Sequence, residues 1–459
     1  MTAKKTVRNM RLSAILVLII GITVTFLPAR AAPPNILLII ADDMGLDASP
    51  CYAVGADKPR MPNLERLCRQ GLVFENAYAA PMCSPTRATI LTGRYGFRTG
   101  VGTAVGRRSG QGLKLSETTL FQFLDRYAPE KYAHAVIGKW HLAAANNGGV
   151  DHPAKAGVGY YAGVISGTVR DYYSWPRSHE GETKTVDGYI TSALTDEAID
   201  WIDKQQGKPW FLWLAHVAPH LPLHLPPKAL HERHHLSAEP PRGRRGGTEY
   251  YLAALEALDS EMGRLLAVVP KNNVVIFMGD NGTPNRTVQE PYSRGRAKAS
   301  KFEGGTHVPL IVWGQGVIRR AQRERALVNS TDLFASIAEL AGIDRPAAEK
   351  WPEDSVSFAS FLGTKPNTER RFAYVEHFGP GGEQSNRRHV RRRQQQFGWA
   401  IRDSRWKYVT NVRHGEQLFD LHADPFESDN LLTGGLSPEA KSAFDSLVSR
   451  GRALRQGGR

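Results

Sequence analysis

Several features are scarce or missing in this sequence. It has no repeat period and no heptad run, which argues against repeat architectures and coiled coils. Beyond residue 32 no apolar run is long enough to cross a bilayer. Apolar residues make up 41% and charged residues 23%, so the composition is globular and not disordered. A chain of 459 residues can form a large core and two domains.

Cysteine is scarce too, since only Cys51, Cys68 and Cys83 are present. In an oxidising compartment an odd count leaves at least one cysteine unpaired. Cys51 and Cys68 could form a disulfide, which would leave Cys83 free, but the sequence does not decide the pairing.

The first 32 residues have the pattern of a signal peptide. Basic residues come first, namely Lys4, Lys5, Arg8 and Arg11. An apolar run follows over Leu12–Leu27, and the small-x-small site Ala29–Ala31 comes after it. An uncleaved membrane anchor is the alternative, and the short apolar run favours the signal peptide. No cysteine follows the run, which argues against bacterial lipid anchoring. We therefore expect export to the periplasm or the medium, with no stable membrane span after cleavage.

The formal net charge is +14, and much of it lies in Arg242–Arg245 and Arg387–Arg393. Neither run belongs to a recognisable nucleic-acid-binding module, so no nucleic-acid partner is expected. A solvated loop surface is the favoured interpretation of both runs. Steering of an anionic substrate is the alternative.

Four continuous apolar runs predict strands that are buried on both faces of a sheet. They are Ile36–Ala41, Ala133–Ile137, Trp210–Leu214 and Val274–Met278. Helical spacing of apolar residues appears over Leu194–Lys204 and Glu249–Leu266. Strands that alternate with helices predict an α/β fold with a large, mostly parallel central sheet flanked by helices.

The chain changes character after about residue 365. Short segments separated by turns predict a small antiparallel sheet: Gly398–Ile401, Trp406–Thr410 and Gln417–Leu421. Pro438–Leu454 is typical of a closing helix. We therefore expect a catalytic domain over residues 33–365 and a smaller C-terminal domain over residues 366–459.

Polar residues follow the predicted strands, at the sheet edge where α/β folds bind ligands. Asp42 and Asp43 end the first run, and Asp280 and Asn281 follow the last. Their oxygen atoms suit Ca²⁺ or Mg²⁺ better than zinc. Either pair alone could be an ordinary turn, but two pairs at the strand ends of one sheet favour a metal site.

A helix start is predicted beside Cys83. Ser84 suits the N-cap and Pro85 the first helical position, so a helix is expected over Thr86–Leu91. Cys83 would then lie just ahead of a helix N-terminus, where free N–H groups favour anions. Arg87 lies one turn in and can point back to the same spot. On this local pattern alone, a structural cysteine is the favoured interpretation.

Other candidates are basic or imidazole groups in loops. Lys139 and His141 alternate, so on an extended chain both would face one way. His216 and His220 follow the Trp210 run, and Lys298 precedes Phe302 to Gly305. A lone histidine or lysine in a loop is usually unremarkable. Three other histidines are expected on the surface: His231, His234 and His235.

Together these residues resemble the type I, arylsulfatase-like sulfatases of the alkaline phosphatase-like superfamily. The Cys83-x-Pro85-x-Arg87 core followed by Thr89–Gly93 is a specific signature of that family. Further matching segments are Pro34–Asp43, Gly138–Leu142, Gly279–Gly282, Glu303–Pro309 and Leu418–Leu431. The resemblance runs from about residue 35 to residue 432. Ala143 and the pair Thr306-His307 depart from the usual pattern without removing a catalytic group.

The resemblance implies that a maturation enzyme oxidises Cys83 to formylglycine (3-oxoalanine), reading Ser84, Pro85 and Arg87. It implies one Ca²⁺, held by Asp42, Asp43, Cys83, Asp280 and Asn281. The hydrated aldehyde would attack the sulfur of a sulfated small molecule or glycan.

The resemblance also assigns roles to the basic residues. Arg87 and Lys139 would hold the diol, and His141 would take the proton of its second hydroxyl. Lys298 and His220 would contact the sulfate and protonate the leaving alcohol. Lys301 lies close to Lys298, but the family spacing to Glu303 favours Lys298.

Three alternative functions can be compared with the sequence. A phosphomonoesterase of the superfamily would need a Ser or Thr nucleophile and histidine-rich zinc ligation, which the sequence does not offer. A phosphonate or phosphodiester hydrolase would share the formylglycine motif. A non-catalytic binder of sulfated polymers would use Arg387–Arg393, and its salt-sensitive binding would survive the loss of Cys83.

Export should remove the first 31 or 32 residues, because the small-x-small site ends at Ala31. N-terminal sequencing of the secreted protein tests this cleavage. An intact Met1 on membrane-bound protein would instead identify the segment as an anchor.

Overall fold

The computed structural model describes residues 33–106, 112–242, 247–344, 351–364, 370–379, 397–412 and 414–457. Pro33–Arg459 forms one compact unit. The predicted signal peptide and the Arg387–Arg393 run lie outside the described residues, as do positions 243–245 of the other basic run. Within the described residues, no helix combines the length and apolar character that crossing a membrane requires.

The described residues form a ten-stranded sheet in the order β10-β2-β9-β8-β1-β7-β3-β4-β5-β6. Its strands are β1 (Asn35–Ala41), β2 (Leu72–Tyr78), β3 (Ala133–Lys139), β4 (Tyr160–Val164), β5 (Ser174–His179), β6 (Glu182–Asp187), β7 (Trp210–Ala215), β8 (Asn273–Gly279), β9 (Leu310–Gly314) and β10 (Gln322–Asn329). The neighbours β8-β1-β7-β3-β4 pair in parallel, whereas β9, β5 and β6 pair antiparallel with their neighbours. The four predicted strands are therefore confirmed, side by side in the centre.

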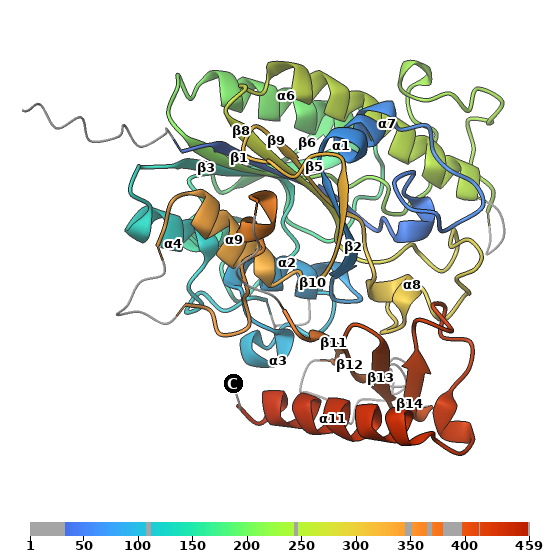
Figure 1. The fold of residues 1–459 in the computed structure, drawn as a ribbon. Coiled ribbons are helices and arrows are strands. Elements are labelled where there is room, and N and C mark those ends of the chain that lie inside the picture. The colour runs from blue at the N-terminus through green and yellow to red at the C-terminus, as the bar shows by residue number, and fades with distance from the viewer. Residues whose placement is uncertain are drawn as a thin grey trace, which may run out of the picture. The chain divides into compact units, whose positions relative to one another are not determined.

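Helices cover both faces of this sheet (Figure 1). The described helices that precede the second sheet in the chain are α1 (Pro62–Gln70), α2 (Cys83–Thr92), α3 (Gly96–Thr99), α4 (Leu120–Tyr127), α5 (His152–Lys155), α6 (Ile190–Asp203), α7 (Thr248–Val268), α8 (Glu303–Thr306) and α9 (Asp332–Leu340). Alternate residues of β1 face opposite layers. Leu38 packs in the core with residues of α2, α4 and α9, and Leu37 in the core with residues of α1, α6 and α7. The predicted helices after residues 194 and 249 are α6 and α7.

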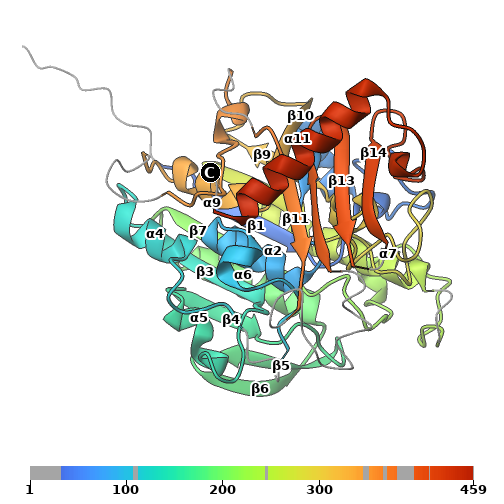
Figure 2. The same cartoon turned by 90° about the horizontal axis from the view of Figure 1, so that it is seen from below.

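The second sheet is antiparallel in the order β11-β12-β13-β14. Its strands are β11 (Ala373–His377), β12 (Gly398–Arg402), β13 (Trp406–Asn411) and β14 (Gly415–Asp420), and α11 (Pro438–Arg455) lies across one face (Figure 2). Trp399 and Tyr408 pack against Leu447 and Val448 of that helix. The predicted small sheet and closing helix are confirmed. The domain boundary near residue 365 stays a prediction.

A buried ion network joins the second sheet to the first. Lys407 of β13 binds Glu303 of α8 at 2.7 Å and Glu427 at 2.9 Å. The Glu303 carboxylate also accepts from Tyr78 of β2 at 2.8 Å and pairs with His307 Nδ1 at 2.9 Å. The imidazole of His307 stacks on the Tyr78 ring. The unusual Thr306-His307 pair is thereby built into the contact between the sheets.

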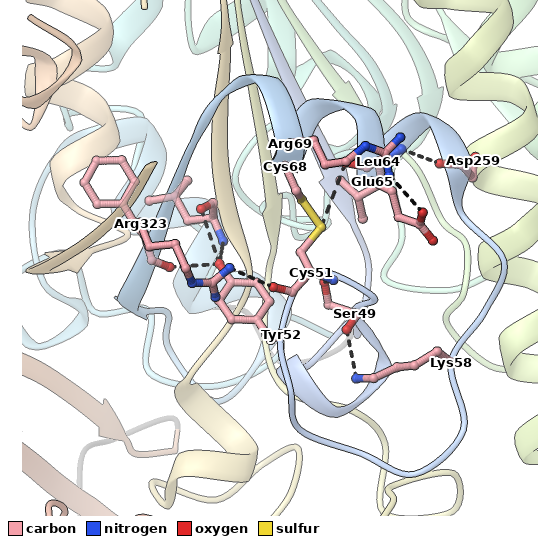
Figure 3. The surroundings of a disulfide bond; sticks show 12 residues. Ser49, Cys51, Tyr52, Lys58, Leu64, Glu65, Cys68, Arg69, Asp259 and Arg323 are labelled. Atoms are coloured by element: carbon pink, nitrogen blue, oxygen red, sulfur yellow. Dashed lines mark hydrogen bonds and ion pairs between the residues drawn. A yellow bond between two sulfur atoms is a disulfide. The ribbon is translucent and has the colours of Figure 1, made fainter. Parts of the chain in front are cut away.

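A disulfide joins Cys51, in the loop after β1, to Cys68 of α1, and Cys83 remains a free thiol (Figure 3). The bond closes a segment of 17 residues in sequence separation. The same segment is held to α7 by the backbone N–H of Leu64, which donates to Asp259 at 2.7 Å. This pairing settles the question that the three cysteines left open.

Replacing both Cys51 and Cys68 by serine should lower the free energy of unfolding by about 3 kcal/mol, the typical effect of closing a loop of this size in the unfolded chain. Denaturant unfolding with and without reductant tests this expectation. The wild type should fall to the variant's stability in reductant, while the variant should not respond. A wild type indifferent to reductant would contradict the prediction.

Candidate active site

The candidate site lies where the central parallel strands end. Asp42 and Asp43 follow β1, Lys139 ends β3, and Asp280 and Asn281 follow β8. His220 lies five residues beyond the end of β7. Lys298 comes from the loop before α8, where its backbone N–H donates to Thr283 O at 3.0 Å. The carboxyl ends of neighbouring parallel strands thus bring together residues that are far apart in the sequence.

Cys83 is the first residue of α2, and its thiol is buried in the cluster. Its Sγ lies 3.3 Å from Asp42 Oδ1, 3.6 Å from Asp43 Oδ1 and 3.5 Å from Lys298 Nζ. The predicted helix is present, but Ser84 as its N-cap is wrong. Met82 is the N-cap, and the Ser84 hydroxyl is used elsewhere, because it donates to the carbonyl of His141.

Two of the cations neutralise Asp42 and Asp280. Arg87, one turn into α2, donates from Nη2 to Asp280 at 2.9 Å and lies 3.7 Å from Asp42. Its Nη1 donates to the carbonyl of Lys139 at 2.6 Å. The ammonium of Lys139 pairs with Asp42. All four side chains are shielded from solvent.

Asp43 is the second centre of charge. Its Oδ1 pairs with Lys298 and accepts from Asn281 Nδ2 at 2.8 Å. Its Oδ2 lies 3.6 Å from His220 Nε2. His220 Nδ1 contacts the carbonyl of Leu221 at 2.7 Å, so Nδ1 carries the hydrogen and Nε2 faces the cluster.

Burial and charge shift the pKa values of these groups in opposite directions. Burial raises the pKa of Asp42, and Asp280 raises it further. Burial alone would raise the pKa of Asp43 too, but the charges of Lys298, His220 and Lys139 hold it well below its usual range. Burial, helped by the carboxylates of Asp280 and Asp42, raises the pKa of the Cys83 thiol. The thiol is therefore an unactivated nucleophile as it stands.

His141 follows β3 in a left-handed conformation, with φ of 57°. The backbone is therefore not extended there, so strand alternation does not decide whether Lys139 and His141 face the same way. Burial lowers the pKa of His141, and the charges of Lys139 and Arg87 lower it further. A buried imidazole beside cations is held neutral, which is the form that can accept a proton.

The oxygen atoms around Asp43 suit a hard cation. The carboxylates of Asp42 and Asp43 and the ring of His220 lie with Cys83 in a group whose ligand atoms are within 4.8 Å of one another. Asn281 Oδ1 is buried and has no hydrogen-bond partner among the described residues. Buried oxygens of this kind, one of them without a donor, fit a Ca²⁺ or Mg²⁺ ion.

The structure also shows residues beside the site whose contacts the sequence did not reveal. Asp43 has φ of 72°, and the Tyr251 hydroxyl of α7 donates to its carbonyl at 2.7 Å. Thr283 donates to Asp47 at 2.6 Å and accepts from the backbone N–H of Gly45, which fixes the loop after Asp43. In the sequence Tyr251 falls on the apolar face of a predicted helix, so it is indistinguishable from a core residue.

The histidines outside the cluster differ in their exposure to solvent. His234 and His235 are exposed as expected, but His231 is buried, at 6% exposure, so its surface placement is wrong. His216 is fully buried just after β7, and Lys301 is buried in the loop that precedes α8. The lysine that does contact Cys83 is Lys298, as the spacing to Glu303 suggested.

The mixed sheet and the buried acids and bases around one cysteine describe an α/β protein with a charged site at its strand ends, and comparison with known proteins gives its class. The Sulfatase family model matches residues 34–343, and the chain belongs to this family. It is therefore a hydrolase of sulfuric esters.

Curated relatives agree over most of the chain. Arylsulfatase G of Rattus norvegicus is 28% identical over 77% of this chain and 73% of its own length. N-acetylgalactosamine-6-sulfatase of Sus scrofa is 31% identical over 71% of this chain and 65% of its own length. The chain thus spans slightly less than two thirds of the latter relative.

Solved structures share the fold. The structure of Ps i-CgsB in complex with k-i-k-neocarrahexaose has a TM-score of 0.75 at 23% identity, over 93% of this chain and 94% of that chain. BT4656 in complex with its substrate D-Glucosamine-2-N,6-O-disulfate has a TM-score of 0.68 at 18% identity, over 92% of this chain and 98% of that chain. Both share the fold of this chain over most of its length.

Replacing Tyr251 by phenylalanine should lower the free energy of unfolding by about 1–3 kcal/mol, because the buried carbonyl of Asp43 loses its donor. Turnover should fall as well, because the hydrogen bond from Tyr251 to that carbonyl helps to hold the left-handed backbone of Asp43 in place. Tyr250→Phe is the matched control on the same helix, because Tyr250 donates to Ser237 and Glu239 instead. Denaturant unfolding and kcat measure the difference, and equal effects on kcat in both variants would contradict the positional role.

Proposed function

We propose that the chain is an exported sulfatase that uses formylglycine, made from Cys83, to hydrolyse sulfate monoesters of carbohydrates. The observation that carries this proposal is the position of Cys83 at the start of α2, with Asp42, Asp43 and Lys298 all within 3.6 Å of Sγ. A maturation enzyme would read the motif from Cys83 to Arg87. The hydrated aldehyde supplies one hydroxyl to attack sulfur and a second to expel sulfate.

The protein residues around position 83 would hold the reacting group and its charge. Arg87 donates to Asp280 and to the Lys139 carbonyl, so its guanidinium is held as a fixed positive charge one helical turn from Cys83. Lys139 adds an ammonium on the Asp42 side. Preorganised cations of this kind stabilise the negative charge that develops on sulfate oxygens, and they do so strongly because water is excluded.

Protonation of the leaving alcohol would fall to Lys298 and His220. Burial would lower the pKa of Lys298, but Asp43 outweighs it and raises that pKa, so the ammonium stays charged and able to donate. His220 presents Nε2 to the same carboxylate. His141 would serve as the base for the second hydroxyl.

Ca²⁺ is the cation that we assign to the oxygen cluster of Asp42, Asp43, Asp280 and Asn281, with the oxygen of modified Cys83 as a further ligand. Ca²⁺ prefers six to eight oxygen ligands, which carboxylates and the unpartnered Asn281 Oδ1 can supply in part. When bound, it would act as a Lewis acid at the sulfate ester.

Carbohydrate sulfates are the substrate class that the comparisons favour. One relative is named for a sulfated amino sugar, one structural neighbour holds D-Glucosamine-2-N,6-O-disulfate, and another holds k-i-k-neocarrahexaose. Aryl sulfates are the simpler alternative, as the name of the rat relative suggests. A turnover panel of sulfated monosaccharides, oligosaccharides and an aryl sulfate would rank them.

Active protein should carry formylglycine at position 83. Mass spectrometry of the tryptic peptide should show sulfur and two hydrogens replaced by one oxygen, and sulfate release should scale with the modified fraction. Cys83→Ala should fold and bind substrate but release no sulfate. Full activity from unmodified Cys83 would contradict the mechanism, and faster turnover of a matched phosphodiester would favour a phosphodiester hydrolase.

Chelation should abolish sulfate release, and Ca²⁺ should restore it. An ion that binds only the folded state stabilises it by about 2.7 kcal/mol when the free ion concentration is 100 times the Kd. The thermal midpoint of unfolding should therefore rise with the Ca²⁺ concentration. Asp43→Ala should lose both effects, whereas Asp196→Ala, an exposed control, should keep them. Stoichiometric zinc in active protein would refute the oxygen-ligand argument.

A further inference from the structure

We propose that Ser84 is a positioning residue, which holds the His141 ring so that Nδ1 is the atom that accepts the proton from the group at position 83. This inference rests on the proposed role of His141 as a base and adds which nitrogen acts and what holds it. Two parts of the chain that are distant in sequence, the start of α2 and the end of β3, meet in this contact.

Three hydrogen bonds form a closed ring. The Ser84 hydroxyl donates to the carbonyl of His141 at 2.8 Å, and the backbone N–H of Val105 donates to the same hydroxyl oxygen at 2.9 Å. The carbonyl of Val105 lies 3.1 Å from His141 Nε2. All three residues are buried, so water does not supply substitute partners.

These hydrogen bonds fix the tautomer of the His141 imidazole. A carbonyl oxygen accepts hydrogen bonds and cannot donate, so Nε2 must carry the hydrogen in its contact with Val105. In a neutral imidazole the other nitrogen then holds a lone pair. His141 Nδ1 is buried and has no hydrogen-bond partner among the described residues, so its lone pair is free to accept.

The backbone conformation of His141 explains why the position of its imidazole depends on Ser84. The left-handed φ of 57° is costly for a residue with a side chain and persists only where surrounding contacts impose it. The N–H of His141 donates to Ile165 at 3.1 Å, and its carbonyl receives the Ser84 hydroxyl. Ser84 therefore binds the carbonyl of a strained residue and at the same time holds Val105, whose carbonyl contacts Nε2 of the His141 imidazole.

The chemical consequence falls on the second half of the reaction. The free hydroxyl at position 83 gives its proton to Nδ1, its O–H electron pair becomes the C=O bond of the aldehyde, and the C–O bond to sulfate breaks with its electrons on sulfate. No oxidant or further reactant is needed. A ring that is misplaced by about 1 Å can cost 10²-fold in rate, so loss of the clamp should slow this step selectively.

Quenched-flow release of the aryl alcohol from matured, Ca²⁺-loaded protein tests the clamp, with rates normalised to the formylglycine content of each variant. Ser84→Ala should release about one equivalent of alcohol quickly and then turn over at least ten-fold more slowly than wild type. His141→Ala should show the same burst, and Lys298→Ala should show none. Ser84→Thr, which keeps the hydroxyl, should restore turnover.

Thr89→Ala is the matched control, because Thr89 is another buried hydroxyl of α2 that donates to Thr86 and contacts Ser330, away from His141. It should lose stability without gaining a burst. A Ser84→Ala variant that slows both phases equally, as a general loss of structure would, overturns the proposal.

The nitrogen signals of ¹⁵N-histidine-labelled protein give a second readout that does not need turnover. The His141 resonances, assigned by their absence in His141→Ala, should show hydrogen on Nε2 and none on Nδ1 in the wild type. Ser84→Ala should mix the two tautomers. A wild type with hydrogen on Nδ1 overturns the clamp, whereas a correct tautomer in a protein inactive on all sulfate esters would support the clamp and refute the proposed function.

Discussion

Three carboxylates buried at one edge of a sheet must be neutralised, and the arrangement of the site follows from that requirement. Asp42, Asp43 and Asp280 are almost fully removed from water, where an unpaired charge costs several kcal/mol. Arg87, Lys139 and Lys298 contact them, so three negative charges meet three positive ones. A bound divalent cation would leave the cluster with a net charge of +2. A site with that surplus attracts an anionic sulfate ester and has the protein's own cations already in place around it.

The fold makes this arrangement possible because it aligns strand ends. β1, β3 and β8 end at one edge, and each places a charged residue there through backbone pairing that the apolar core stabilises. α2 then brings its first turn to the same edge, which orients Cys83 and Arg87 together. The strained backbones of Asp43 and His141 lie at this edge as well. Strain of this kind is tolerated because the surrounding sheet and helices fix both residues on several sides.

The sequence predicted the parts of this site that depend on local pattern. Apolar runs such as Ile36–Ala41 identified the central strands, and the residues after them identified the acids. The helix at Cys83 was also predictable from Pro85. Ser84 was assigned the wrong contact, because a serine before a proline has the pattern of a cap whether or not a distant carbonyl competes for its hydroxyl. The partner, His141, is 57 residues away, and no local rule reports a contact at that separation. Tyr251 was missed for the same reason, since helical spacing identifies the buried face but not what the hydroxyl at its end touches.

The second sheet contributes to the site indirectly, because it anchors the loop that carries Lys298. Lys298 lies in the loop that leads to α8, and α8 begins at Glu303. The backbone N–H of Glu303 donates to Glu427 at 2.6 Å, and its carboxylate binds Lys407 of β13. Burial alone would raise the pKa of Glu303, but the charges of Lys407 and His307 lower it well below its usual range, so the carboxylate stays ionised and the pairing persists. The end of the Lys298 loop is therefore anchored on a charged pair supplied by the C-terminal sheet. The C-terminal segment that carries Glu427 therefore fixes the far end of the loop whose lysine contacts both Asp43 and Cys83.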